Sequence, residues 1–354
     1  MSIKKILIIR FRRVGDAVLS TVLCTSLRRS FPDAQIDYVL NEGVAPLFEG
    51  HPDVDNVITF TEKESSNIFF YAKRVWQVMR NCQYDVIIDI RSTVKTLFFP
   101  LLSLSTPYRI GTKKRYNYFL HNYRVDNRSD SNENVVLHLL RLLKPLESIA
   151  NINYCEEFTL VLSEPEVLDF RQRMSTLGVD FARPVIVAAV TARLAHKVWD
   201  KNRMKEILQR MIDKYQAQII FNYGNAEEAF AKALHHEMND DPAIFTNIKA
   251  SSLRELSAMM LNADFFFGNE GGPRHISQAL GLPSYAIFPP GTSKSLWLPM
   301  TEEPRYLGIS PDDLCSLEEQ KPMSYKQRFD LITVEDVWQD VDSMLQRYLH
   351  HKAH

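Results

Sequence analysis

Short apolar runs followed by segments with helical spacing occur in two series along the 354-residue chain, and this alternation constrains its fold most. The first run, Lys5–Phe11, is almost continuously apolar, which is typical of a strand buried on both faces of a parallel sheet. Ala17–Ser30 follows with its apolar residues on one side of a helix. The order starts again at Val185–Val190. The alternation predicts an α/β protein with two doubly wound parallel sheets.

We expect further strands and helices on the same grounds, and from them two domains. The strands are expected at 36–40, 57–60, 86–90, 218–222, 265–268 and 284–288, and the helices at 68–79, 93–102, 134–143, 165–177, 201–215, 226–238, 252–261, 273–280 and 334–348. The domains are placed at 1–163 and 164–354, and the last helix packs either within the second domain or back on the first. Because open parallel sheets bind ligands beyond the carboxyl ends of their strands, we expect a ligand cleft between the domains.

Charge is unevenly distributed, although the formal net charge is only -1. Residues 1–150 carry 21 Lys and Arg against 15 Asp and Glu, whereas the remainder carries 21 against 28. A basic first half suits an anionic ligand or surface, but this charge is too weak and scattered to indicate nucleic-acid binding. The four cysteines are too widely spaced to indicate a metal site. With no signal-peptide pattern and no apolar run long enough to span a bilayer, we expect a cytoplasmic protein.

The turn after the first strand contains the first candidate for chemistry. Gly15 permits a tight turn, and Asp16 falls where the following helix begins. Two interpretations of Asp16 remain open. Its carboxylate either caps the helix or acts as a general base at the carboxyl end of a strand.

A glycine-rich turn, Gly268–His275, is the second candidate. Its glycine pair lets the backbone approach a ligand closely, and its proline suits the first position of a helix. The free N–H groups at a helix N-terminus bind anions. Arg274 or His275 would add positive charge against a diphosphate, while the alternative is an ordinary turn with a solvated Arg274.

Two more turns follow strands of the second half. In Thr191–Trp199, Lys197 would neutralise a phosphate as a point charge, and the Trp is expected to pack beneath the loop. In the turn at 222–228, Glu227 or Glu228 would accept hydrogen bonds from a ribose. The alternative is that these acids only favour a helix start. All four candidate segments occupy strand-to-helix turns, which is where such folds bind ligands.

Together these segments resemble the bacterial lipopolysaccharide heptosyltransferases, glycosyltransferase family 9, over nearly the whole chain. Ile8–Thr21 is similar to the family's first strand, Gly-Asp turn and helix, and 84–90 is similar to its central strand. Asn269–Pro283 is similar to the segment Asp-Thr-Gly-x-x-His-hydrophobic-Ala-x-Ala-Leu-Gly-x-Pro. Glu270 and Gly271 replace the usual Asp and Thr of that segment, which bears on the choice of donor sugar.

The resemblance implies a GT-B fold and an inverting transfer of heptose from a nucleotide diphosphate sugar, typically ADP-heptose, to a lipopolysaccharide-type acceptor. It implies that Asp16 is the base. Neither a metal nor a cofactor is required by this design. The residues assigned to the donor are Thr191, Lys197, Gly224, Glu227, Glu228, Glu270, Gly271, Gly272 and His275. Those assigned to the acceptor are Arg12, Arg13, Arg91, Lys95 and Lys113.

Two other functions stay open. One is a nucleotide-sugar epimerase of the same fold, and the other is a non-catalytic nucleotide-sugar-binding homologue, which the exchange at 270–271 favours. The basic run 113–115, followed by aromatic residues, has two interpretations as well. It is either a solvated loop or a contact with the cytoplasmic face of the inner membrane.

Overall fold

The computed structural model describes residues 3–11, 13–126, 133–298 and 304–349. The chain divides into two compact units, Met1–Val161 and Leu162–His354. This division lies two residues before the domain boundary expected from the sequence. No helix within the described ranges is both long and apolar enough to cross a bilayer.

The first unit is a six-stranded sheet with helices, and every strand pairs with its neighbours in parallel. Its strand order is β3-β2-β1-β4-β5-β6. The strands are β1 (Lys5–Ile9), β2 (Gln35–Asn41), β3 (Asn56–Phe60), β4 (Val86–Asp89), β5 (Tyr108–Thr112) and β6 (Tyr123–Val125). The helices are α1 (Val14–Leu19), α2 (Thr21–Ser30), η1 (Ala45–Phe48), α3 (Glu62–Ser66), α4 (Ile68–Asn81), α5 (Phe98–Leu101), η2 (Arg115–Asn117), α6 (Val135–Leu140) and η3 (Arg141–Ser148).

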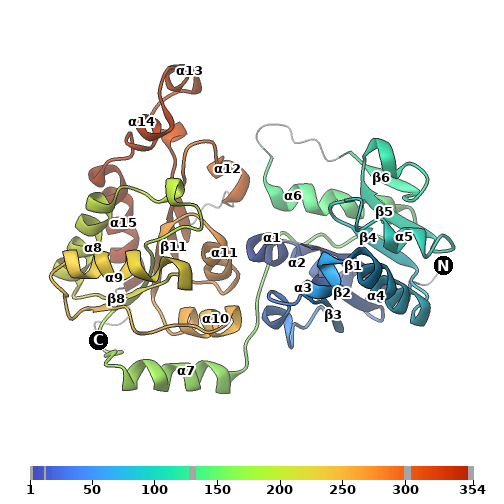
Figure 1. Cartoon of the computed structure of the whole chain (residues 1–354), viewed down its shortest axis with the longest axis horizontal. Coiled ribbons are helices and arrows are strands. Elements are labelled where there is room, and N and C mark those ends of the chain that lie inside the picture. The colour runs from blue at the N-terminus through green and yellow to red at the C-terminus, as the bar shows by residue number, and fades with distance from the viewer. Residues whose placement is uncertain (1–2, 12, 127–132, 299–303, 350–354) are drawn as a thin grey trace. The chain divides into compact units, whose positions relative to one another are not determined.

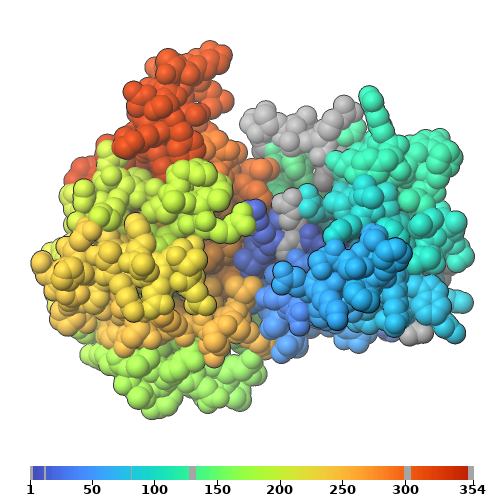
Figure 2. All heavy atoms as spheres, viewed as in Figure 1, coloured from blue at the N-terminus to red at the C-terminus, as the bar shows by residue number. Residues whose placement is uncertain are grey.

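The second unit repeats this plan with a sheet ordered β12-β11-β10-β7-β8-β9 (Figure 1). Its strands are β7 (Val185–Ala189), β8 (Gln218–Phe221), β9 (Ile244–Phe245), β10 (Phe265–Asn269), β11 (Ser284–Ile287) and β12 (Tyr306–Ile309). Its helices are α7 (Glu164–Thr176), η4 (Ala195–Lys197), α8 (Lys201–Tyr215), η5 (Asn225–Glu227), α9 (Glu228–Glu237), α10 (Leu253–Leu261), α11 (Gly272–Ala279), α12 (Lys294–Trp297), η6 (Pro311–Asp313), α13 (Leu317–Gln320), α14 (Tyr325–Phe329) and α15 (Val334–Leu349). Helices α13 and α14, in orange-red, project from the body of this unit (Figure 2).

The strand order reverses once in each sheet, between β1 and β4 in the first unit and between β7 and β10 in the second. Chain leaving these strands on opposite sides of the sheet opens a crevice at their carboxyl ends, where parallel α/β sheets bind ligands. Both sheets therefore have the doubly wound parallel topology expected of the halves of a GT-B enzyme. The turns after β1, β4, β7 and β10 line the two switch points.

Two helices of the first unit differ from the sequence expectation. The single helix expected over 17–30 is broken at Ser20, whose hydroxyl bonds the carbonyl of Ala17 and the hydroxyl of Tyr38. The helix expected over 93–102 is reduced to α5, because the Thr96 hydroxyl donates to the Thr93 carbonyl at 2.9 Å and holds a turn there. Such local side-chain bonds compete with helical hydrogen bonding.

The last helix, α15, packs within the second unit. Its apolar face, including Val337, Val341 and Leu345, joins the core that also contains Ile207 and Met211 of α8. Within the second unit, α15 therefore has the packing that one of the two alternatives expected, with α8 covering its apolar side chains.

Candidate functional site

Asp16 lies in the first turn of α1, directly after the β1 turn. Its carboxylate accepts a hydrogen bond from Arg10 Nη2 at 2.8 Å, and its side chain is 19% exposed. The N-cap position belongs to Arg13, and no side chain caps this helix. The interpretation of Asp16 as a helix cap is therefore wrong. It is a partly exposed, ion-paired carboxylate at the carboxyl end of β1.

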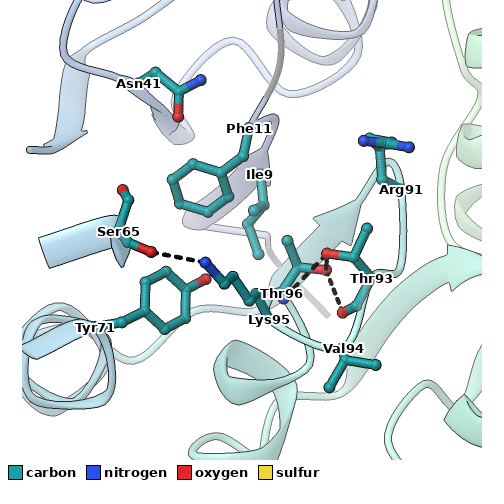
Figure 3. Close-up of a pocket in the computed structure, with 10 residues that line it drawn as sticks. All are labelled: Ile9, Phe11, Asn41, Ser65, Tyr71, Arg91, Thr93, Val94, Lys95 and Thr96. Carbon is teal, nitrogen blue, oxygen red and sulfur yellow. Dashed lines mark hydrogen bonds between the residues drawn. The ribbon is translucent and has the colours of Figure 1, made fainter. Parts of the chain in front are cut away.

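A cavity of about 480 Å³ lies at the switch point of the first unit (Figure 3). Residues from three neighbouring strand ends line it. Ile9 and Phe11 come from β1 and its turn, Asn41 ends β2, and the chain after β4 supplies the largest share. The full lining is Ile9, Phe11, Asn41, Ser65, Tyr71, Arg91, Thr93, Val94, Lys95 and Thr96.

Polar groups are placed around this cavity by local contacts. Lys95 Nζ donates to the Ser65 carbonyl at 2.7 Å, which fixes the ammonium at the cavity wall (Figure 3). Tyr71 is 1% exposed, and its hydroxyl has no hydrogen-bond partner within the described residues. Burial and the charge of Asp89 raise the pKa of Tyr71, so its hydroxyl keeps its proton. Since buried polar groups are normally paired, this hydroxyl is available to a ligand.

A buried cluster supports the turn after β4. Asp89 Oδ1 accepts hydrogen bonds from the N–H groups of Arg91 (3.3 Å) and Ser92 (2.8 Å), and Ser92 has a left-handed φ of 50°. Asp89 Oδ2 lies 3.7 Å from His121 Nε2. Burial raises the pKa of Asp89 to about 6 and, together with a nearby arginine, lowers the pKa of His121 to about 4. A Cβ on Gly111 would lie 2.7 Å from His121 Nε2, so this packing requires glycine.

Only some of the Arg and Lys residues assigned to the acceptor lie at the cavity. Arg91 and Lys95 line the cavity. Arg13 is exposed at the N-cap of α1, and Lys113 is exposed after β5, and neither is among the lining residues. Arg12 lies outside the described residues. The sequence did not single out Tyr71 or His121; the burial of a hydroxyl and an imidazole from distant segments depends on tertiary packing.

In the second unit, Asn269 ties the two central strands together. Its Nδ2 donates to the Ala189 carbonyl at 3.0 Å, and its Oδ1 accepts from the Trp199 N–H at 2.8 Å. The preceding Gly268 has a φ of 136°, and a Cβ there would lie 2.4 Å from the Ala189 oxygen. The ends of β10 and β7 and the loop after β7 are therefore held together by the Asn269 amide and by a close backbone approach that glycine permits at 268. Trp199 is 1% exposed, as expected of a packing residue.

The structure distinguishes Glu227 from Glu228. Glu227 Oε2 accepts hydrogen bonds from Thr191 Oγ1 at 2.9 Å and from the Gly224 N–H at 2.8 Å, so it joins the turns after β7 and β8. Glu228 instead pairs with Lys232 at 2.8 Å and with a second lysine at 2.7 Å. Hydrogen bonds from these lysines lower the pKa of Glu228 to about 2. Glu227 is the carboxylate that faces the ligand end of the sheet.

The glycine-rich turn opens α11 as expected. The helix begins at Gly272 with Gly271 at its N-cap and without a capping side chain, so its first N–H groups are left for another acceptor. Pro273 occupies the first turn of the helix. The carboxylate of Glu270 lies 4.0 Å from His275 Nε2. The uncapped N–H groups at the start of α11 suit binding of an anion.

Arg274 is fully buried, so the alternative of a solvated Arg274 is wrong. Its guanidinium donates to Gln278 Oε1 at 2.9 Å and to the Trp297 carbonyl at 3.2 Å. Burial lowers the pKa of Arg274 to about 10. Burial and the Arg274 charge lower the pKa of His275 well below its usual value, so His275 is neutral at pH 7. Through these hydrogen bonds, buried Arg274 links α11 to α12.

Lys197 lies in η4 and is half-buried, and no side-chain partner is found for it within the described residues. A second cavity, of about 360 Å³, lies beside this loop and includes His196, Trp199, Phe230 and Tyr325 in its lining. The donor-assigned residues Glu227, Gly272 and His275 do not line it. No set of three His, Cys, Asp or Glu side chains in the described ranges is placed to hold a metal ion.

The chain is similar in sequence to a known family and to several named proteins. A family model for glycosyltransferase family 9 (heptosyltransferase) matches residues 72–326. The chain is 25% identical to lipopolysaccharide heptosyltransferase 1 of Campylobacter coli, over 80% of this chain and 83% of that protein. It is 22% identical to lipopolysaccharide heptosyltransferase 3 of Escherichia coli K12, over 81% and 83%.

Solved structures share the fold. A glycosyltransferase family 9 protein from Veillonella parvula superposes with a TM-score of 0.82 at 18% identity, covering 97% of this chain and 98% of that one. E. coli ADP-heptose heptosyltransferase II gives a TM-score of 0.72 at 20% identity, covering 97% and 99%. The E. coli heptosyltransferase WaaC with ADP gives 0.68 at 18% identity, covering 96% and 99%. The family match spans well over half of the chain, and the protein therefore belongs to glycosyltransferase family 9, the heptosyltransferases.

Proposed function

We propose that this protein transfers heptose from ADP-heptose to a lipopolysaccharide-type acceptor with inversion at the anomeric carbon. The observation that carries the proposal is the chemistry of the two switch points. The first has the Asp16 carboxylate and a cavity with cations, and the second has Glu227 and an open helix N-terminus. Relatives named for ADP-heptose transfer, and a related structure with ADP, support adenine as the base of the donor.

In the proposed step, an acceptor hydroxyl loses its proton to Asp16 as its oxygen forms a bond to the anomeric carbon. The bond from that carbon to the diphosphate oxygen breaks, through an oxocarbenium-like state, and ADP leaves with the electron pair. Charge that develops on the diphosphate is met by Lys197 and by the N–H groups of Gly271 and Gly272. The neutral imidazole of His275 donates or accepts a hydrogen bond without adding charge.

We assign the acceptor to the first unit, with Arg91 and Lys95 at the cavity, and the donor to the second. Glu227 holds the ribose hydroxyls in this proposal, and the two N–H groups at 271 and 272 take the place of the usual threonine hydroxyl. We propose that the reaction needs no cofactor besides the nucleotide sugar, and that it takes place in the cytoplasm.

Two measurements test the proposal. Calorimetry with ADP, UDP and GDP should show clear preference for ADP, and incubation with ADP-heptose and a lipopolysaccharide-core acceptor should release ADP and form the glycoside. Preference for another nucleotide would refute the donor assignment. Isomerised sugar formed from the donor alone would indicate an epimerase, and ADP binding without turnover across a panel of core acceptors would indicate a non-catalytic homologue.

A further inference from the structure

Arg274 is a charged side chain of the glycine-rich turn that the proposed chemistry leaves unused. It stands at one of the two unspecified positions between Gly272 and His275 in the segment that resembles the family's. Its side chain is fully buried, although it belongs to the first turn of α11. Because burying a guanidinium is costly unless its charge is balanced, a buried arginine at the start of this helix calls for an anion.

The hydrogen-bond acceptors of Arg274 are neutral. Its guanidinium donates to Gln278 Oε1 and to the Trp297 carbonyl, and its Nε has no partner among the described residues. Within the part of the chain that the structure describes, Arg274 forms no ion pair. Burial lowers its pKa to about 10, so it stays charged at pH 7, and the Glu270 charge acts on this pKa in the opposite direction. The described protein groups therefore leave the Arg274 charge only partly balanced.

Arg274 also fixes the position of His275. Its Nη2 lies 3.1 Å from both ring nitrogens of His275, so the guanidinium lies against the imidazole. The Trp297 ring meets the same imidazole edge-to-face, with ring centroids 5.5 Å apart. Arg274 bonds the carbonyl of this tryptophan, where α12 lies beside α11 (Figure 1). Both groups that pack on the imidazole are therefore held by Arg274.

The Arg274 charge adds to the positive potential at the start of α11. The first N–H groups of this helix are uncapped, and the helix dipole is positive at this end. A buried charge in the same turn is screened less by water and salt than a surface charge is. The Glu270 carboxylate, 4.0 Å from His275 Nε2, is the opposing charge. A diphosphate at this helix end would meet a positive potential that Glu270 offsets only in part.

We propose that Arg274 is a positioning residue for the donor diphosphate: it fixes His275 at the start of α11, and the bound diphosphate balances its buried charge. The inference rests on the proposed function, because it takes the diphosphate to bind at α11. Arg274 acts through His275 and through its charge, since its own side chain is fully buried. The balance improves further as negative charge develops on the leaving diphosphate.

Binding of ADP, compared with binding of adenosine, tests the proposal without any acceptor, since adenosine lacks the diphosphate. Calorimetry on the full-length protein gives both dissociation constants. Arg274→Met keeps a long side chain but removes its charge. We expect this variant to bind ADP at least about tenfold more weakly, and to bind adenosine within about twofold of the unmodified protein. Arg274→Lys keeps the charge and should bring ADP affinity back to within about threefold of the unmodified protein.

Glu270→Gln tests the same balance of charge with the opposite sign. It removes the opposing carboxylate, so ADP should bind about threefold more tightly while adenosine binding stays unchanged. The matched control is Arg183→Met. Arg183 Nε also donates to a backbone carbonyl, that of Gln216 at 2.9 Å, but it precedes β7 and so lies at the opposite end of the sheet from α11. This control should leave both dissociation constants unaltered.

Equal losses of ADP and adenosine affinity in Arg274→Met would show that Arg274 only holds α11 against α12, and would overturn the proposal. If that variant does not fold, unchanged or weaker ADP binding by Glu270→Gln overturns it instead. An unmodified protein that binds no ADP would refute the donor assignment and this inference with it. ADP binding by the unmodified protein, with equal losses for the two ligands in the variant, refutes this inference alone.

Discussion

The two sheets have the same strand plan, but their switch points are built differently. In the first unit, side chains from the ends of β1 and β4 and from α4, among them Lys95 and Tyr71, line a cavity. In the second unit the backbone of Gly268 lies close to Ala189, the Asn269 amide donates to the Ala189 carbonyl, and α11 leaves its first N–H groups uncapped. The sheet topology sets the position of the ligand site, and the residues of the turns determine which chemical groups of a ligand that site can bind.

The largest expected effect tests the side-chain switch point. If Asp16 is the base, Asp16→Asn keeps the size of the side chain but removes its ability to take a proton. We expect kcat to fall by about 10²- to 10⁴-fold, the usual contribution of a general base. The ADP dissociation constant should stay unchanged, because the donor is assigned to the other unit. Steady-state kinetics and calorimetry on the same preparation measure both.

Asp33→Asn is the matched control, since Asp33 is an exposed aspartate of the same unit. It should leave both kcat and ADP affinity unaltered. A transfer rate of the Asp16 variant within a few fold of that of the unmodified protein would show that the carboxylate only pairs with Arg10. The first switch point would then contain no catalytic base at Asp16.

The second prediction concerns the buried support of the cavity. Because burial raises the pKa of Asp89 from its ordinary value of 3.8 to about 6, the folded protein binds this proton more tightly than the unfolded chain does. Asp89 therefore lowers the free energy of unfolding as pH rises from about 4 to 6, by up to about 3 kcal/mol. His121, whose pKa is lowered, changes stability in the opposite direction over a similar range.

Asp89→Asn removes one of these opposed contributions while keeping an oxygen for the N–H of Ser92. The variant should gain stability relative to the unmodified protein as pH rises from 4.5 to 7. Urea denaturation at both pH values measures the difference in unfolding free energy. A difference that does not change with pH would mean that Asp89 is not a titrating part of this cluster, and that the cavity wall is held by hydrogen bonds alone.

Much of this architecture is encoded locally and could be predicted. Continuous apolar runs identified the central strands, and the strand-to-helix turns located Asp16, Glu227 and the glycine-rich segment. Local patterns failed where tertiary contacts decide. The Ser20 hydroxyl breaks a helix because the Tyr38 hydroxyl lies beside it. Arg274 is buried because the Trp297 carbonyl, at the end of α12, accepts a hydrogen bond from its guanidinium. Both partners are distant in sequence, so helical spacing carries no sign of them.

The third prediction tests the backbone-built switch point. Glu227→Gln keeps an oxygen that can accept from Thr191 and from the Gly224 N–H, but it removes the charge offered to a ribose. We expect ADP affinity to fall about tenfold, in the range of a lost hydrogen bond to a charged group. Calorimetry with ADP measures the change, and circular dichroism checks that the unit is intact. An unchanged affinity for ADP would show that the nucleotide does not bind at Glu227.

The smallest effect on ADP affinity is expected at Glu228. This prediction best distinguishes Glu228 from Glu227 as the residue that holds the ribose. Glu228 is paired with Lys232 and a second lysine at the surface, and such pairs contribute little to affinity or stability. Glu228→Gln should therefore change ADP affinity by less than about twofold, measured as for Glu227→Gln under the same buffer conditions. If instead Glu228→Gln weakens ADP binding and Glu227→Gln does not, the ribose is held by the residue that α9 presents, and the lysine pairs must open when the donor binds.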